Sequence, residues 1–290
     1  MREGHASRTA RQNALFRALE ARRPPGDRVA NDPLAARFLT PEFRGLADLA
    51  YLPPVRRLLE VVIDHRWPCA RAGVVARTRL IDETILGVLP RVEQVIILGA
   101  GFDTRPYRLE GMESVAVFEL DHPATQEAKR DVLRRRGALP TQVSFVAVVF
   151  GRDDPARELA NAGFKSDRPT LVLWEGVTNY LDANSVSATF EFLAAAIATG
   201  SVVVFTYVDR GMLDGTADFA GADTTMRAVQ HVGEPFTFGF DPAEIPAYLA
   251  ARGFEMSWDE VVADAARRFY PPGRCPSVPA YYHVVNSWRI

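Results

Sequence analysis

The stretch VIILGAGFDTRPYRL, residues 95–109, decides the fold class. Its first four residues are apolar and mostly β-branched, and they stop at Gly99, which is typical of a short buried strand that ends in a tight turn. Gly99-Ala100-Gly101 then has the form of the turn at which a doubly wound sheet lets a ligand approach the backbone. Thr104 replaces the third glycine of the dinucleotide fingerprint, so the turn by itself predicts a binding site without naming its ligand.

Further apolar runs of the same kind occur at 115–118, 143–150, 171–174 and 201–208, and a last strand is expected at 281–288. Helical stretches that are followed by glycine separate several of them, at 123–136, 153–162 and 185–199. Apolar strands that alternate with helices indicate βαβ units and a parallel sheet with helices on both faces. The predicted class is α/β and Rossmann-like.

The flanking regions predict covers for this sheet within a single domain over residues 1–290. Residues 1–90 read as a helical N-terminal cover, with prolines between the helices and a strong apolar stripe over 70–89. Residues 91–208 form the predicted cofactor-binding core. Residues 209–240 lack a clear period and are expected to form a lid or substrate insertion over the ligand crevice. Residues 241–290 should supply a C-terminal helix, capped by Asp241, and the last strands.

Composition limits the class of partner. The 290 residues carry 34 basic and 36 acidic side chains, a net charge of −2, with 48% hydrophobic and 24% charged residues. These values exclude a disordered, collagenous or coiled-coil chain and argue against a nucleic-acid partner, which needs a basic surface. Two cysteines without metal-like spacing predict no metal site and a reducing compartment. With no apolar leader, we expect a soluble, cytoplasmic protein with no membrane partner.

Two acids close the second predicted strand. Glu119 and Asp121 lie 20 and 22 residues after Gly99, where a carboxylate can accept both ribose hydroxyls of an adenosine-containing ligand. The alternative is that both are turn residues that face solvent.

Several motifs together carry a family resemblance. They are GAGFDTR within 95–109, FELDHP (118–123), LWEGVTNYL (173–181), Arg77-Thr78-Arg79 with Ile81-Asp82, and GEPFTFGFDPAEIPAYLAARGF (233–254). In this order they resemble the leucine carboxyl methyltransferase family, which includes bacterial O-methyltransferases of polyketide and other secondary metabolism. The resemblance implies a class I methyltransferase that uses S-adenosyl-L-methionine, with a seven-stranded, mostly parallel sheet, a reversed last strand and a helical N-terminal cover.

The resemblance also implies roles for single residues. Gly99 and Gly101 would pass along the methionine part of the cofactor, and Asp121, with Glu119 beside it, would bind the ribose. Arg77 would pair with the cofactor's carboxylate, a role that suits a planar guanidinium, although a surface salt bridge is the plainer alternative for an arginine on a helix. Glu175 would lie near the cofactor's cationic end.

The chain departs from the family at the adenine. Where many relatives have an aspartate after the third strand, this chain has Val149, which cannot accept a hydrogen bond from the adenine amine. Recognition would then depend on stacking by Phe150, on a backbone carbonyl, or on Asp153 or Asp154.

The predicted activity is methyl transfer to a carboxyl or phenolic oxygen of a small molecule, with a polyketide-type metabolite as one such acceptor. His231 and Tyr180 are the candidate catalytic residues, and Arg105 and Arg108 could grip an acidic substrate. Two alternatives remain: a cofactor-binding protein that has lost turnover, and a nicotinamide-dependent oxidoreductase, against which Thr104 counts.

Overall fold

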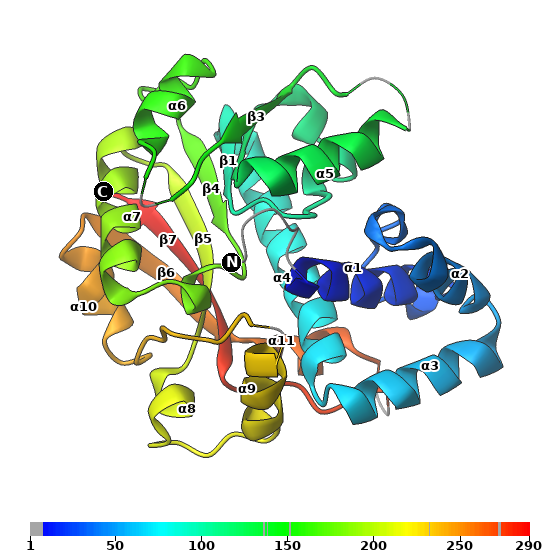
Figure 1. Cartoon of the computed structure of the whole chain (residues 1–290). Helices are drawn as coiled ribbons and strands as arrows, with labels where there is room; N and C mark the ends of the chain where they lie inside the picture. The colour runs from blue at the N-terminus through cyan, green and yellow to red at the C-terminus, as the bar shows by residue number, and fades with distance from the viewer. Residues whose placement is uncertain (1–7, 136, 138, 151, 232, 272–273) are drawn as a thin grey trace.

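A computed structural model describes residues 8–290 apart from 136, 138, 151, 232 and 272–273. Within this part of the chain, strands β1 to β7 form one sheet in the order β3-β2-β1-β4-β5-β7-β6 (Figure 1). The strands are β1 Gln94–Leu98, β2 Ala116–Asp121, β3 Val143–Ala147, β4 Thr170–Trp174, β5 Val202–Val208, β6 Phe254–Val261 and β7 Tyr282–Arg289.

Strand direction confirms the predicted sheet. Strand β7 runs antiparallel to both of its neighbours, β5 and β6, whereas the other pairs are parallel. Because β1 lies between β2 and β4, the chain leaves β1 toward one side of the sheet and later crosses to the other side. Ligands of doubly wound sheets bind outside the carboxyl ends of the strands at such a switch point.

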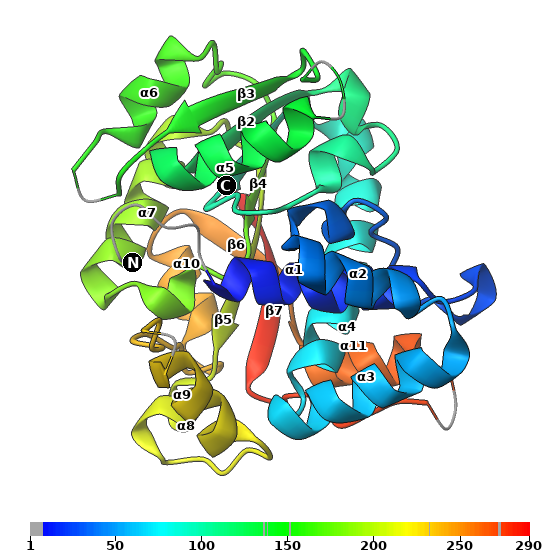
Figure 2. The same ribbon diagram turned by 45° about the vertical axis from the view of Figure 1, so that its right-hand side comes forward.

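Helices cover both faces of the sheet. Apolar residues of α4 and α11 pack on one face, which α5 also covers, and those of α6, α7 and α10 pack on the other (Figures 1 and 2). Helices α1, α2 and α3 lie outside these layers, whereas α4, which the sequence analysis assigned to the same N-terminal cover over residues 1–90, packs on the sheet. The bounds are α1 Arg8–Ala21, α2 Pro41–Leu49, α3 Pro53–Arg66, α4 Ala70–Val88, α5 Pro123–Arg134, α6 Pro155–Asn161, α7 Ala183–Ala196, α8 Arg210–Asp214, α9 Ala222–His231, α10 Ile245–Ala250 and α11 Val262–Phe269.

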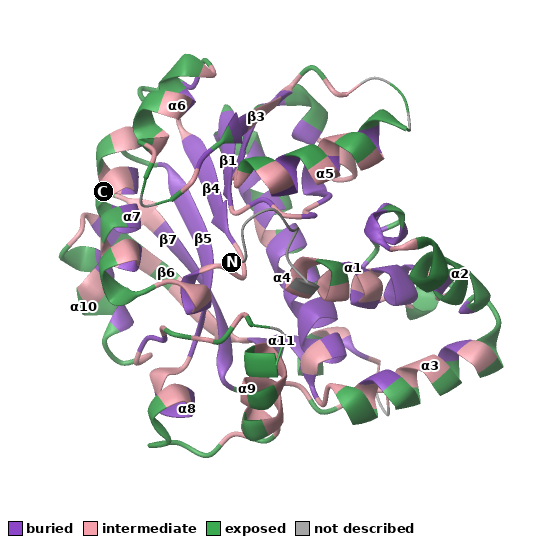
Figure 3. Ribbon diagram, in the orientation of Figure 1, coloured by how far each residue is buried: buried purple, intermediate pink, exposed green. Residues whose placement is uncertain are grey.

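The central strands are buried along their whole length, as Figure 3 shows in purple. Burial on both faces explains why β1, β4 and β5 read as continuous apolar runs rather than as an alternation. None of the helices in the described ranges is long and apolar enough to cross a lipid bilayer.

Near the C-terminus the structure differs from the sequence analysis at the start of α10 and at β6. Helix α10 begins at Ile245, because Asp241 closes a separate turn in which its carboxylate accepts the N–H of Ala243 at 2.9 Å. Strand β6 had no predicted bounds, since its sequence, FEMSWDEV, mixes acidic residues into an edge strand that is only partly buried.

Candidate functional site

A crevice of about 600 Å³ opens at the carboxyl ends of the first four strands. Its walls are the segments that follow these strands, 99–105 after β1, 121–122 after β2, 148–150 after β3 and 175–177 after β4. Residues of α1 and of the segment 233–237 complete the lining. The sequence motifs that carried the family resemblance therefore meet in one place.

The glycine turn after β1 needs glycine for space as well as for conformation. Gly99 has φ +63°, and a Cβ built on it would lie 2.5 Å from Cγ2 of Val177, closer than side-chain atoms approach one another. Gly101, at φ +42°, donates its N–H to Oδ2 of Asp121 at 2.5 Å. The turn thus presents backbone without side chains to the crevice, and its Gly101 N–H holds the carboxylate of Asp121 on the neighbouring strand.

Asp121 holds a fixed carboxylate at the end of β2. Its second oxygen, Oδ1, accepts the N–H of His122 at 2.6 Å, so each carboxylate oxygen keeps a lone pair for a further donor. Burial raises the pKa of Asp121, although the two backbone N–H groups oppose this rise. A carboxylate in this position suits a ligand with two neighbouring hydroxyls.

Glu119 lies elsewhere than the sequence suggested. It is fully buried, 2.8 Å from Nζ of Lys129 on α5, and its Oε1 accepts the hydroxyl proton of Tyr107 at 2.8 Å. Although Glu119 and Asp121 point to the same face of β2, two residues along a strand move a side chain about 6–7 Å deeper under the helix layer. Glu119 therefore ties α5 to the sheet and, in the described lining of the crevice, only Asp121 of the two is present.

Glu175 is clamped between two arginines. Its Oε1 accepts Nε of Arg77 at 2.7 Å, and its Oε2 accepts Nη1 of Arg105 at 2.6 Å. Burial opposes ionisation, but the charges of Arg105 and Arg77 outweigh it and lower the pKa of Glu175 to about 2. Within the described residues, Nε is the one nitrogen of Arg77 with a hydrogen bond, and the guanidinium lies 4.7 Å from the ring centre of Tyr282. Arg77 therefore has donors available for a bound anion.

The other arginines of the crevice are already paired within the chain. Arg105 also bonds Asp82 and Asp103 at 2.7 Å each, and Arg108 forms a two-point contact with Asp82 at 2.7 and 2.9 Å. Arg105 and Arg108, which the sequence suggested as contacts for an acidic substrate, are thus bound to the chain's own carboxylates.

Sequence reasoning missed the outer half of this ionic network. Asp32 accepts both Nε of Arg17 at 2.8 Å and the hydroxyl of Thr104 at 2.7 Å, and Arg17 also donates to the carbonyl of Phe102 at 2.9 Å. These contacts join α1 and the segment after it to the glycine turn. No sequence spacing signals a pairing across about 70 residues, whereas the arginines and Asp103 after the turn stood inside the quoted motif.

The end of the crevice that follows β3 has an aromatic wall. Phe150 lines the crevice with 39% of its surface exposed. The two acids nearby serve the backbone: Asp153 accepts the N–H of Val149 at 2.8 Å, and Asp154 caps α6 through the N–H groups of its first turn. Of the predicted alternatives, these contacts favour Phe150 and a backbone carbonyl.

A smaller hollow of about 110 Å³, called the annex below, adjoins the crevice. The two hollows share residues of their lining, namely Thr9, Asn13, Arg77, Gly176 and Tyr180. The annex continues between α1, α4, α9 and the segment 279–282, and its walls include the rings of Phe16, Trp67, Phe236 and Tyr281. Arg77 is the one charged side chain among the described residues of this lining.

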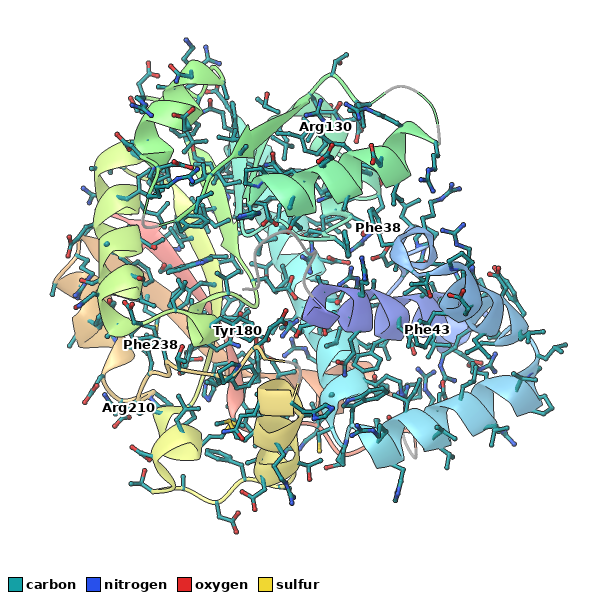
Figure 4. All side chains as sticks on the ribbon, viewed as in Figure 1. Phe38, Phe43, Arg130, Tyr180, Arg210 and Phe238 are labelled. Carbon is teal, nitrogen blue, oxygen red and sulfur yellow. The ribbon has the colours of Figure 1, made fainter. Side chains whose placement is uncertain are left out.

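The two candidate catalytic residues separate in the structure. Tyr180 lies at the junction of the hollows, in the middle of the molecule near α9 (Figure 4), edge-on to Phe236 at 5.4 Å. Burial raises its pKa above the ordinary value, so the phenol keeps its proton at neutral pH. His231 is exposed at the end of α9 and is absent from the described lining of both hollows, because the helix turns this side chain outward. This position contradicts a catalytic role for His231.

Comparison with known proteins defines the class. The model of the leucine carboxyl methyltransferase family matches residues 10–194, which is more than half of the chain. The chain therefore belongs to the leucine carboxyl methyltransferase family, and the predicted resemblance is confirmed.

Mycobacterial relatives extend this match. A protein of Mycolicibacterium paratuberculosis with the name "Putative S-adenosyl-L-methionine-dependent methyltransferase" is 37% identical over 172 residues, 59% of this chain and 51% of the relative. The chain thus spans about half the length of that relative. A protein of the same name from Mycobacterium sp. (strain KMS) is 33% identical over 247 residues, which cover 83% of this chain and 80% of the relative.

Solved structures share the fold at low sequence identity. A DUF574 family protein from Streptomyces avermitilis superposes with a TM-score of 0.64 at 11% identity and covers 99% of both chains. An O-methyltransferase family protein from Burkholderia thailandensis superposes with a TM-score of 0.52 at 16% identity, over 89% of this chain and 76% of the other. These similarities agree with the predicted Rossmann-like fold.

Proposed function

We propose that this chain transfers a methyl group from S-adenosyl-L-methionine to a carboxyl or phenolic oxygen of a small, largely apolar acceptor, such as a polyketide-type product of secondary metabolism. One observation carries the proposal: a crevice with fixed charges opens, at Arg77 and Tyr180, into an annex with aromatic walls. The first hollow suits a charged nucleoside cofactor and the second suits an apolar ring. The names of the mycobacterial relatives support the choice of cofactor.

The residues of the crevice fit this cofactor at each of its ends. Asp121 offers a carboxylate to the ribose hydroxyls, and Gly99, which has no side chain, leaves room for the methionine part of the cofactor. The free donors of Arg77 suit the amino-acid carboxylate, while Glu175 remains ionised near the positive groups. Phe150 offers a ring against which the adenine can stack.

The junction of the two hollows supports an oxygen acceptor. Arg77 lines both hollows, and its guanidinium, which Glu175 holds at Nε, is the one charge in the described lining of the annex. A positive charge there favours an ionised oxygen on the acceptor. A carboxylate arrives ionised, since its pKa is about 4, whereas a phenol with a pKa of about 10 depends on this field to lose its proton.

Alignment is the chief task of the protein in this reaction. When bound, the cofactor supplies a methyl group that its sulfonium has already activated. The rigid strand ends and the aromatic walls of the annex hold acceptor and donor in register, an effect that supplies roughly 7–11 kcal/mol. Tyr180, which stays protonated, donates a hydrogen bond at the junction and excludes water rather than acting as a base.

Calorimetric titration with S-adenosylhomocysteine tests the cofactor site. The substitution Asp121→Asn removes the ionised acceptor and should weaken binding about 10- to 100-fold, as expected for the loss of a hydrogen bond to a charged group. Asp131→Asn is the matched control, because Asp131 is an exposed acid on α5 that pairs only with Arg134 among the described residues. This control should bind as the wild type does.

Methyl transfer is then measured by mass spectrometry with 2-naphthoate and 2-naphthol, which present a carboxyl and a phenolic oxygen on the same apolar ring. A product heavier by one methylene unit supports the proposal. Folded wild-type protein that fails to bind S-adenosylhomocysteine would contradict it. Binding without transfer to either class of acceptor would instead favour the non-catalytic alternative, and binding of reduced nicotinamide cofactor would favour the oxidoreductase.

A further inference from the structure

Helix α3 has its polar side turned toward the rest of the protein. Glu60 pairs with Arg23, two residues after the end of α1, and lies 3.7 Å from Arg71 of α4, and Asp64 accepts two hydrogen bonds from Arg71 at 2.6 and 2.9 Å. A surface helix ordinarily packs its apolar stripe against the core and shows its charges to water. The inner side of α3 combines these ion pairs with the buried Ile63 and the partly buried Leu59.

The apolar stripe of α3 faces outward. Leu58, Val61 and Val62 follow the i, i+3, i+4 spacing of one helix face, and 56% to 67% of each residue is exposed. Isolated apolar residues on a surface need no explanation, but a stripe that occupies the whole outer face of a helix does.

The preceding helix also exposes apolar residues. Of the nine residues of α2, Ala47 alone is buried, and Phe43, Leu46 and Leu49 are between 41% and 52% exposed. Tyr51 and Leu52, in the turn that joins the two helices, are more than half exposed. Figure 3 shows the resulting green colour over α2 and along α3, and Figure 4 labels Phe43. We call the exposed apolar residues of the segment 43–62 the α2–α3 surface.

Its area is that of one half of a stable interface. Eight large apolar residues that are about half exposed leave on the order of 700 Å² open, if each has about 150–200 Å² in all. The largest apolar patch of a typical monomer is about 300–600 Å², whereas each partner of a standard interface buries about 800 Å². We propose that a second copy of this chain covers the α2–α3 surface in a two-fold dimer.

The charges at the rim fit self-association. The rim of α2 carries the exposed acids Glu42 and Asp48, of which Asp48 also pairs with Arg22 of its own chain, beside the exposed Arg44, and the rim of α3 carries Arg57 and Arg66. A two-fold axis that sets α2 of one copy against α3 of the other brings acids toward arginines twice. An anionic lipid surface would attract the arginines but repel the acids, so the rim favours a protein partner with the same mixture of charges.

The dimer would stabilise the cover of the active site without adding a group to it. The ion pairs of Glu60 and Asp64 connect α3 to the turn after α1 and to α4, and residues of α4 line the crevice and the annex. Because α2 and α3 bury little of their own apolar surface, the second copy supplies burial that the monomer lacks.

Sedimentation equilibrium of the full chain over a range of concentrations tests this proposal. Wild-type protein should be a dimer at micromolar concentration. The double substitution Leu58→Glu and Val61→Glu places four charges in the interface of one dimer and should raise the dimer dissociation constant by at least about 100-fold. Leu86→Glu is the matched control, since Leu86 is an apolar residue of α4 that is 43% exposed and lies outside the segment 43–62. This variant should remain a dimer.

Circular dichroism and binding of S-adenosylhomocysteine establish that the variants remain folded, and neither the dimer nor its loss depends on methyl transfer. A wild type that is monomeric at 100-fold higher concentration, or a double variant that dimerises as tightly as the wild type, would overturn the proposal. Wild-type protein that stays monomeric and sediments with phosphatidylglycerol vesicles would overturn it as well, because a membrane would then be the occupant of the α2–α3 surface.

Discussion

The crevice and the annex meet at Arg77 and Tyr180, yet they are built from different chemistry. Four arginines that line the crevice bond to four carboxylates of the chain, and the members of this network are Arg17, Arg77, Arg105, Arg108, Asp32, Asp82, Asp103 and Glu175. The annex has aromatic and aliphatic walls with Arg77 as the one charge in its described lining. Fixed charges select one charged cofactor, whereas apolar walls select by shape and tolerate a range of rings.

The largest expected effect comes from breaking the charge network. Glu175→Gln leaves Arg77 and Arg105 without their shared carboxylate in a buried place, and loss of one member of a buried ion pair costs about 3–5 kcal/mol. Urea denaturation should show this loss of unfolding free energy, together with weaker binding of S-adenosylhomocysteine. Glu83→Gln is the control, because the pair of Glu83 with Arg79 on α4 is exposed and its loss should cost at most about 1 kcal/mol. If the two variants lose the same unfolding free energy, the ion pairs of the crevice contribute no more to stability than an exposed pair.

Acid should weaken the same network in a defined pH range. The pKa of Glu175 is about 2 in the folded chain and 4.5 as a free side chain, so the unfolded chain binds the proton first as the pH falls. Above about pH 5, Glu175 contributes its full share of the unfolding free energy, on the order of 3 kcal/mol. This contribution is lost as the pH falls from about 5 to about 2. Urea midpoints measured across this range should fall less steeply in Glu175→Gln than in the wild type. Parallel curves for the two proteins would show that Glu175 is not held as an anion.

The contrast between the hollows also explains how far the sequence could predict them. The floor of the crevice lies in short motifs next to strand ends, and parallel strands bring such ends together, so the sequence could single out Gly99, Asp121 and Glu175, which the structure brings to one crevice. Glu119 was misplaced, because alternation along a strand identifies the face but not the depth beneath a helix. The outward turn of His231 likewise depends on how α9 packs.

The annex and the outer charges could not be predicted in this way. The annex is closed by side chains from α1, α4, α9 and the segment 279–282, which are brought together only by the complete fold. The bond from Thr104 to Asp32 spans 72 positions and leaves no periodic signal. The departure from the family pattern at Val149 was visible in the sequence, and Phe150, one of the alternatives it suggested for the adenine, lines the crevice.

Filling the annex should affect the acceptor and leave the cofactor alone. Ala228 of α9 lines the annex, and Ala228→Trp places an indole where the acceptor ring is expected. We expect the KM for the naphthalene acceptors to rise at least about tenfold, the equivalent of about 1.4 kcal/mol, with an unchanged dissociation constant for S-adenosylhomocysteine. Gln230→Trp adds the same ring on the exposed side of α9 and serves as the control. If the acceptor KM is unchanged in Ala228→Trp, the acceptor binds outside the annex.

The smallest effect is expected at Phe150, where the crevice has an aromatic wall as the annex does. Phe150 is an aromatic wall in the otherwise charged hollow, and it is still 39% exposed, so stacking on it contributes only part of the about 0.5–1.5 kcal/mol that an aromatic pair can give. Phe150→Ala should therefore weaken S-adenosylhomocysteine about two- to tenfold in a calorimetric titration, and Phe150→Tyr should restore the binding, because the face of the ring is kept. Deletion of the adenine, with S-ribosylhomocysteine as the ligand, should abolish the difference between wild type and Phe150→Ala. If the difference persists with that ligand, Phe150 acts on the shape of the crevice and not on the base, and adenine recognition belongs to the backbone after β3.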